Sequence, residues 1–190
     1  MIRPMGRVVY LMNVSLDGYV EDRAGTLEWT GMDEELHQWF NDDMRRYAAM
    51  LYGRRLYETM VPYWPMAASD PDISEVELEF ARLFLDKPKI VFSSTLESVD
   101  WNSRLVRGDV AAELPKLREE FAGDLSVAGP SLAAGLIANG LVDEFKLVVH
   151  PVILGGGKRY WPEHDQPLDL ELVEERRLGS RFLLLDYRRR

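Results

Sequence analysis

Two stretches of this chain join an apolar strand to a helix through a glycine, and both could bind an anion. In the first, the apolar run at residues 48–52 stops at Gly53, and a helix opens with Arg54 and Arg55. Arginines in the first turn of a helix oppose its macrodipole, whose positive end lies there. Their position makes sense if an anion binds at the turn, where Gly53 allows close approach and free N–H groups point outward. The alternative is an ordinary strand-to-helix turn with two solvated arginines.

The second turn follows an apolar strand at residues 124–127 and has the sequence Ala128-Gly129-Pro130-Ser131-Leu132. Proline suits the first helical position because its φ is preset and no useful N–H is lost. The glycine again removes side-chain bulk where a helix N-terminus faces outward. Two such turns make a better phosphate cradle than one, so we expect them to lie side by side around a shared ligand.

Three side chains are candidates for contact with a substrate. Asp17 follows an apolar strand at residues 7–14, where open α/β sheets bind ligands, and it is the candidate catalytic carboxylate. Asp17 and Gly18 are also a common turn pair, so a purely local role is the alternative. Trp29 could cover the same crevice or close the core. Glu35 lies beside the apolar stripe of a helix, although capping that helix is its alternative role.

Hydroxyl and imidazole side chains add weaker signals. Ser93 and Ser94 follow a strand at residues 88–92 and could contact a phosphate or a ribose, or cap the next turn. His150 lies in an apolar run, which indicates a core or strand-face residue, whereas His37 and His164 lie in polar surroundings. Because the three histidines are scattered and the chain has no cysteine, we expect no metal site.

The composition excludes several classes of protein. With 46% apolar and 29% charged residues in 190, the chain is typical of a soluble globular protein, and we expect one domain over residues 1–190. A net charge of −9 argues against nucleic acid or an anionic membrane as a partner. No apolar run approaches the roughly 20 residues that span a bilayer, and no signal peptide is evident, so we expect a cytoplasmic protein.

The order of the predicted elements indicates an α/β fold. Apolar strands alternate with amphipathic helices that begin near residue 33, at residues 75–86, and near Asp109. Pro115 predicts that the third of these helices begins late or is kinked. A long strand covers residues 144–154, and residues 62–74 read as a surface loop. These elements predict three αβα layers around a mostly parallel sheet with antiparallel C-terminal edge strands.

The antiparallel edge is predicted at residues 170–174 and 182–187, which alternate in polarity on either side of Gly179. Exposed edge strands that carry Phe182, Leu183 and Leu185 favour pairing with a second copy. We therefore expect a homodimer.

Six stretches together resemble the dihydrofolate reductase superfamily, in the branch similar to the C-terminal reductase domain of the bifunctional riboflavin-biosynthesis deaminase–reductase. The likeness runs from about Gly6 to Arg188, and the stretches occur in the family's order. They are residues 15–18 (SLDG), 53–58 (GRRLYE), 91–94 (VFSS), 127–132 (VAGPSL), 140–144 (GLVDE) and 151–157 (PVILGGG). Where the superfamily often has two consecutive glycines this chain has Ala128-Gly129, and Leu56 stands where many relatives have threonine.

The resemblance implies an NADPH-dependent oxidoreductase with its cofactor in a crevice at the carboxyl ends of the strands. Gly53, Arg54 and Arg55 would hold cofactor phosphates, with Arg54 facing the 2′-phosphate, and Ser93 and Ser94 would line the adenosine end. Residues 129–132 would place the pyrophosphate at a helix N-terminus, and Ala128 would also contact the cofactor. Asp17, Trp29 and Glu35 would fall in the substrate half.

Two functions are therefore open. The first is a reductase that transfers hydride to a C=N or C=O bond of a small heterocyclic or ribosylated substrate. Such an enzyme would resemble 5-amino-6-(5-phosphoribosylamino)uracil reductase or a pterin or dihydrofolate reductase. The second is a non-catalytic module that binds a nucleotide or another small ligand on the same fold, because Asp17 is the one well-placed carboxylate.

Overall fold

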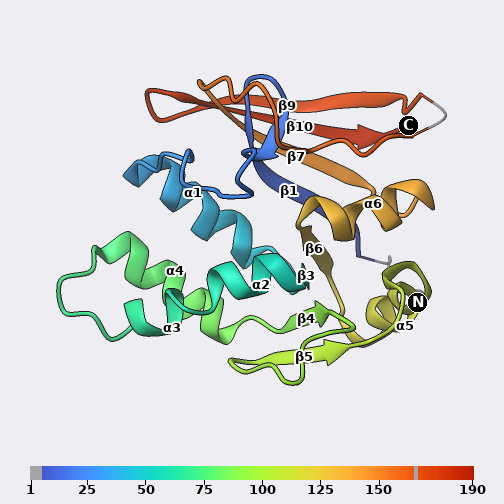
Figure 1. Cartoon of the computed structure of the whole chain (residues 1–190), viewed down its shortest axis with the longest axis horizontal. Helices are drawn as coiled ribbons and strands as arrows, with labels where there is room; N and C mark the ends of the chain where they lie inside the picture. The colour runs from blue at the N-terminus through green and yellow to red at the C-terminus, as the bar shows by residue number, and fades with distance from the viewer. Residues whose placement is uncertain (1–5, 165–166) are drawn as a thin grey trace.

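The computed structural model describes residues 6–164 and 167–190, in which an eight-stranded sheet carries helices on both faces (Figure 1). The strands of this sheet are β1 (Val8–Ser15), β3 (Tyr47–Gly53), β4 (Lys89–Phe92), β5 (Ser103–Val106), β6 (Asp124–Ala128), β7 (Glu144–His150), β9 (Leu170–Leu178) and β10 (Phe182–Arg189). The helices are α1 (Glu34–Arg45), α2 (Arg54–Met60), α3 (Trp64–Ala67), α4 (Glu75–Asp86), α5 (Val110–Glu120) and α6 (Pro130–Ala138).

The sheet has the strand order β5-β4-β3-β6-β1-β7-β10-β9. All pairs from β5 to β7 are parallel, while β10 pairs antiparallel with both β7 and β9. Because right-handed crossovers place the intervening helices on the two faces of such a sheet, the result is three layers. The predicted αβα fold with antiparallel C-terminal strands is confirmed.

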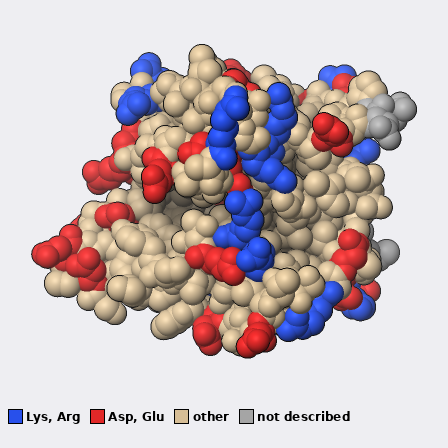
Figure 2. Space-filling view, viewed as in Figure 1, with Lys and Arg blue, Asp and Glu red and all other residues tan. Residues whose placement is uncertain are grey.

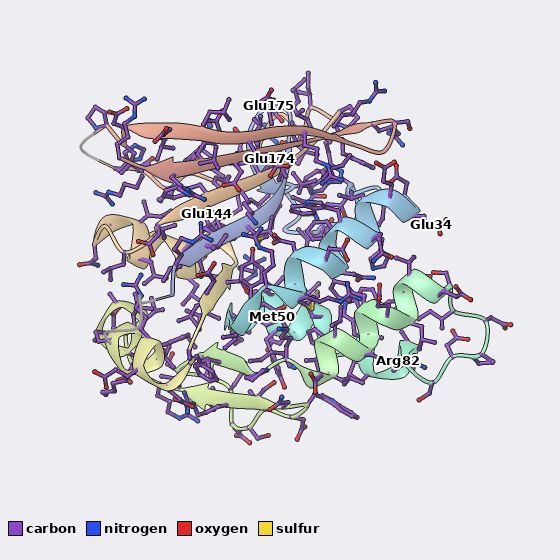
Figure 3. All side chains as sticks on the ribbon, turned by 180° about the vertical axis from the view of Figure 1, so that it is seen from behind. Glu34, Met50, Arg82, Glu144, Glu174 and Glu175 are labelled. Carbon is purple, nitrogen blue, oxygen red and sulfur yellow. The ribbon has the colours of Figure 1, made fainter. Side chains whose placement is uncertain are left out.

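Alternation along β3 divides the core between the two helical layers. Ala49 and Leu51 pack with residues of α5 and α6, whereas Met50 and Tyr52 pack with residues of α1 and α4. Figure 3 shows α1 and α4 side by side on this second face, with Met50 close to α1. The face that carries α1 and α4 contains one of the two cavities described below.

An ion pair buried between α1 and the sheet fixes the position of that helix. Lys146 Nζ of β7 lies 2.5 Å from Asp43 Oδ1 of α1, and the two side chains are 1% and 2% exposed. Removing one partner would leave the other charge buried without compensation, which costs several kcal/mol. The pair therefore fixes the position of α1 over β7, and α1 forms part of the wall of a cavity described below.

The helix boundaries follow their caps. The Asp33 side chain accepts from the Leu36 N–H at 2.8 Å and starts α1, and Ser74 forms a capping box with Glu77 that starts α4 at its predicted residue. Asp109 caps α5, which begins at Val110 and runs through Pro115. Of the two alternatives for this helix, the late start is therefore wrong.

Four details differ from the sequence-based expectations. β7 ends at His150, because residues 151–154 leave the sheet, and a small separate ladder joins β2 (Tyr19–Glu21) to β8 (Lys158–Arg159). Residues 62–74 include α3, whose Trp64 packs against the core. The outer edge strand of the sheet is β9, and Phe182 of β10 is buried, not exposed as expected. The expected homodimer stays a prediction. In the described part of the chain, no helix is long and apolar enough to cross a membrane.

Candidate active site

The two glycine turns meet at the carboxyl edge of the sheet. β3 and β6 are parallel neighbours whose last paired residues are Tyr52 and Ala128. A Cβ built on Gly53 would lie 3.7 Å from the Leu132 Cβ, and one built on Gly129 would lie 4.0 Å from the Leu56 Cβ. Each turn therefore packs against the helix that follows the other, as the sequence led us to expect.

A cavity of about 330 Å³ opens between these turns, and we call it the glycine cleft. It is lined by most of the residues expected to bind a cofactor, namely Gly53, Arg54, Arg55, Gly129, Pro130, Ser131 and Leu132. Glu21 and Gly25 line its opposite wall. The cleft thus joins residues from β2, α2 and α6.

The helix N-termini at the cleft are not capped by side chains. Gly53 and Gly129, the N-cap residues of α2 and α6, make no side-chain cap, and neither first turn carries an acid. Gly129 has φ +101°, which side chains rarely allow, and its N–H lies 3.1 Å from the Met12 thioether, a weak acceptor. The amides at the start of α6 are therefore suited to an anion.

Both arginines at the cleft already have carboxylate partners. Arg54 pairs with Glu58 at 3.0 Å along α2, and Arg55 pairs with Glu21 at 3.2 Å across the cleft. Figure 2 shows Lys and Arg side chains gathered in a central band on this face, with acidic side chains interspersed. An anion that binds here has to compete with or rearrange these pairs, which are individually weak because both guanidinium groups are open to solvent.

The remaining expected cofactor residues lie at the margins. The Ser93 hydroxyl accepts from the Thr95 and Leu96 N–H groups at 3.2 and 3.0 Å, so it caps the turn after β4. The Ser94 carbonyl accepts from Arg107. Neither serine lines the glycine cleft, although the preceding Phe92 does. Ala128 lines a second cavity instead.

This second cavity, of about 410 Å³, adjoins the first and is the one we call the aromatic cavity. Met12, Leu27 and Leu56 line both, so the two cavities share a wall. The aromatic cavity lies between the sheet and the helices α1 to α4, where Figure 2 shows the surface hollowed and mostly uncharged. Its volume is within the range of small-molecule sites.

His37 is one of the polar side chains of this cavity that sequence reasoning did not assign to the site. It is buried on α1, with its ring 5.7 Å from that of Trp64 and 5.3 Å from that of Phe80. Burial lowers the pKa of the imidazole, and the nearby Glu77 only partly opposes this, so His37 is neutral near pH 7. Its spacing from Phe40 and Met44, three and seven residues on, was the helical signal that could have placed it on this face.

The three expected substrate residues line neither cavity. Asp17 Oδ1 accepts from the Ser15 hydroxyl and the Leu154 N–H, and Oδ2 accepts from the Gly155 N–H at 2.8 Å. Partial desolvation raises the Asp17 pKa, but these hydrogen bonds outweigh it, and the net shift is downward. Asp17 therefore ties the end of β1 to the loop after β7, and its expected catalytic role stays a prediction.

Trp29 and Glu35 also lie outside the cavity walls. The Trp29 ring packs edge-on against His150 at 5.4 Å, while its neighbours Leu27 and Thr30 line the aromatic cavity. Glu35 is exposed in the first turn of α1. His150 is buried, as expected, and bonds to Asn13 at 2.9 Å. Within the described ranges, no three His, Asp or Glu side chains are grouped to hold a metal ion.

Comparison with known proteins identifies the family to which this fold and site belong. The model of the RibD C-terminal domain matches residues 7–184, so the chain belongs to that family. The uncharacterized protein YyaP of Bacillus subtilis is 32% identical over 182 residues, which cover 95% of this chain and 94% of that protein.

Solved structures agree on the fold. A putative riboflavin biosynthesis protein from Shewanella superposes with a TM-score of 0.76 at 21% identity and covers 97% of this chain and 99% of its own. Dihydrofolate reductase from Enterococcus faecalis, solved in complex with NADP(H) and RAB-propyl, gives a TM-score of 0.65 at 14% identity and 97% coverage of both chains. The expected dihydrofolate-reductase-like fold and the RibD C-terminal branch are therefore confirmed.

Proposed function

We propose that the chain is an NADPH-dependent reductase that acts on a small substrate with a C=O or C=N bond. The observation that carries the proposal is the shared wall of the glycine cleft and the aromatic cavity. A dinucleotide in the first would lie beside a small organic molecule in the second. Membership of the RibD C-terminal domain family supports the same reading.

The glycine cleft fits a nicotinamide dinucleotide. Two glycines, which carry no side chain, the uncapped start of α6 and two arginines provide the close approach, amide donors and positive charge that its phosphates require. Bound NADPH would supply hydride to the electrophilic carbon while the heteroatom takes a proton from solvent, and NADP⁺ remains. Arg54 would face the 2′-phosphate, and residues 129–132 would hold the pyrophosphate.

The chain's own part is binding and orientation. Met12, Leu27 and Leu56 would separate the two ligands from water at their point of contact, because all three are apolar and line both cavities. Holding two reactants in one geometry provides much of the rate acceleration in such reactions. Ser93 and Ser94 would border the adenosine end only if the ligand extends past Phe92.

A titration of the protein with NADPH, with quenching of tryptophan fluorescence as the readout, tests the proposal. Arg54→Ala should weaken NADPH binding several-fold and leave NADH binding nearly unchanged, because only NADPH carries the 2′-phosphate. Arg104→Ala is the matched control, since Arg104 is equally exposed and pairs with Glu120 away from the cleft. Equal loss of both cofactors, or no loss of either, would contradict the assignment.

A second function, a non-catalytic ligand-binding module, is favoured because only one carboxylate is found among the described residues that line the aromatic cavity. Glu77 is the one carboxylate among its described lining residues, and it caps α4. Tight NADPH binding without oxidation of NADPH by any carbonyl or imine compound would favour the module. Turnover with a defined product would discard it.

A further inference from the structure

The walls of the aromatic cavity carry almost no charge. Among the described residues that line it there is no lysine or arginine, and Glu77 is the one acidic side chain. The other ionisable group near neutral pH is His37, whose pKa is lowered by burial and which is therefore uncharged. An anionic ligand would find no opposite charge in this cavity.

The helix N-terminus beside the cavity is also occupied. In α4, the Ser74 side chain accepts from the Glu77 N–H, and the Glu77 carboxylate reaches back to Ser74. The first turn further contains Glu75. Negative charge already fills the position where a phosphate would bind to a helix, so α4 offers no anion site.

The shape and chemistry of the walls favour a flat apolar molecule. Trp64 packs against Phe80 with ring centroids 4.2 Å apart, and the His37 ring lies against both. Flexible methionines such as Met44 and Met60 also line the cavity, which suits ligands of varied outline. At the mouth, Met32 and Tyr63 remain 48% and 52% exposed, an apolar surface that a ligand would cover.

We propose that the aromatic cavity binds an uncharged, flat and largely apolar carbonyl or imine compound that carries no phosphate or carboxylate group. His37, buried with its ring among aromatic side chains, provides a polar contact for the ligand's heteroatom. The proposal rests on the proposed reductase function for the ligand's role as substrate. It separates this chain from the phosphoribosylated pyrimidines that the family resemblance implies, because a phosphate dianion buried here would lose its hydration without a cationic partner.

Calorimetric titration of the full chain with 1-naphthol and with 1-naphthyl phosphate tests the ligand class, because the two differ only in the phosphate. We expect 1-naphthol to bind at least about tenfold more tightly, the equivalent of roughly 1.4 kcal/mol. Trp64→Ala should weaken 1-naphthol binding at least about fivefold through loss of stacking area. Met66→Ala is the matched control, because Met66 lies on the same short helix but is exposed and does not line the cavity.

Met60→Lys provides a second variant that does not depend on removing a large side chain. Met60 lines the cavity and is only partly buried, so an ammonium group there can remain near the mouth. Because the ammonium group attracts the phosphate, the Met60→Lys variant should bind 1-naphthyl phosphate more tightly than the unmodified chain does. The ratio of the two dissociation constants that favours 1-naphthol should therefore decrease or reverse. Equal or tighter binding of 1-naphthyl phosphate to the unmodified chain, or binding of neither probe below about 1 mM, would overturn the proposal.

The test of the ligand class and the test of NADPH binding can fail separately. If NADPH fails to bind while the naphthol preference and its dependence on Trp64 hold, the reductase function is wrong and the ligand class stands. If NADPH binds with the expected dependence on Arg54 while the phosphate ester is preferred, the ligand class is wrong and the reductase function stands.

Discussion

Gly53 at the end of β3 lies against Leu132 in the first turn of α6, where a Cβ built on the glycine would be 3.7 Å from the leucine Cβ. The reciprocal contact joins Gly129 to Leu56 at 4.0 Å. Two loops that are distant in the chain thus form one cleft, and the absence of a side chain at each glycine keeps it open. The two glycines nevertheless have different backbone conformations, which allows their roles to be separated.

Gly129→Ala should impair both folding and cofactor binding. The residue has φ +101°, and holding alanine in such a conformation costs on the order of 1–3 kcal/mol. Strain that moves the start of α6 would also displace the amides that we assign to the pyrophosphate. We expect a lower free energy of unfolding in urea and weaker NADPH binding, and an unchanged unfolding curve would contradict the observed backbone conformation.

Gly53→Ala is the matched variant and should affect binding alone. With φ −78° and ψ 161° the position accepts alanine, which stabilises compatible sites by about 0.4–1 kcal/mol. The added methyl would enter the glycine cleft, at ordinary contact distance from Leu132. NADPH affinity should therefore fall while stability is maintained or raised. If the Gly53→Ala variant loses stability but not NADPH affinity, then NADPH does not lie close to the backbone of Gly53.

Glu21→Gln should strengthen NADPH binding. Glu21 is mostly buried in the cleft wall and pairs with the more exposed Arg55, so its charge opposes an incoming phosphate and occupies a guanidinium. Because Arg55 is 60% exposed, solvent screens the pair, and releasing it is worth roughly 0.2–1 kcal/mol, a factor of up to about five in the dissociation constant. Glu120→Gln breaks the comparable pair with Arg104 away from the cleft and should leave binding unchanged. Weaker binding of NADPH to the Glu21 variant would show that Glu21 orients Arg55 for the ligand.

Asp17→Asn distinguishes a catalytic from a structural role for Asp17. The carboxylate accepts from two backbone amides in the loop after β7, and an asparagine can replace only one of its two acceptor oxygens. The geometry therefore predicts a lower melting temperature and unchanged NADPH affinity of the folded protein. Reduced turnover with an unchanged melting temperature would instead support the catalytic role expected from the sequence.

His150 should make the fold sensitive to acid. Burial, with a smaller contribution from Arg181, lowers the pKa of His150 to about 4. The unfolded chain binds this proton with an ordinary pKa near 6.5, so the stability associated with neutral His150 is lost as the pH falls from about 6.5 to about 4. The slope is at most about 1.4 kcal/mol per pH unit for one proton.

Comparison with the His150→Gln variant isolates the effect of that proton from the effects of other titrating groups. One of these is Asp186, whose pKa is raised by burial to about 7, so that its protonation increases stability as the pH falls. The difference in unfolding free energy between the two proteins should shrink as the pH falls through this window. NMR titration of the folded protein should show a neutral His150 ring at pH 5.5. A protonated ring at that pH would contradict the prediction.

Local signals were enough to predict the main elements and the two turns that line the glycine cleft. Gly53, Arg54, Gly129 and Pro130 could be recognised because a strand, a glycine and a helix start are encoded by neighbouring residues. The period of polarity distinguishes strand from helix, and parallel strands end at the same edge of a sheet, so both turns were expected there. Glu75 to Asp86 were assigned to their helix with correct ends because Ser74 and Glu77 form a cap within four residues.

Only the tertiary structure decided which residues form the walls of the aromatic cavity. His37 and Trp64 lie on separate helices, and they become cavity walls because α1, α3 and α4 pack on one face of the sheet. Asp17, expected at the site, is instead bonded to a loop that is remote in the chain. The sequence by itself determined the main helices, the strands of the large sheet and the glycine turns, since those depend on neighbouring residues, but not α3, β2 or β8. The folded chain decided which side chains face a cavity and which are used in long-range hydrogen bonds, because both depend on residues brought together only by packing.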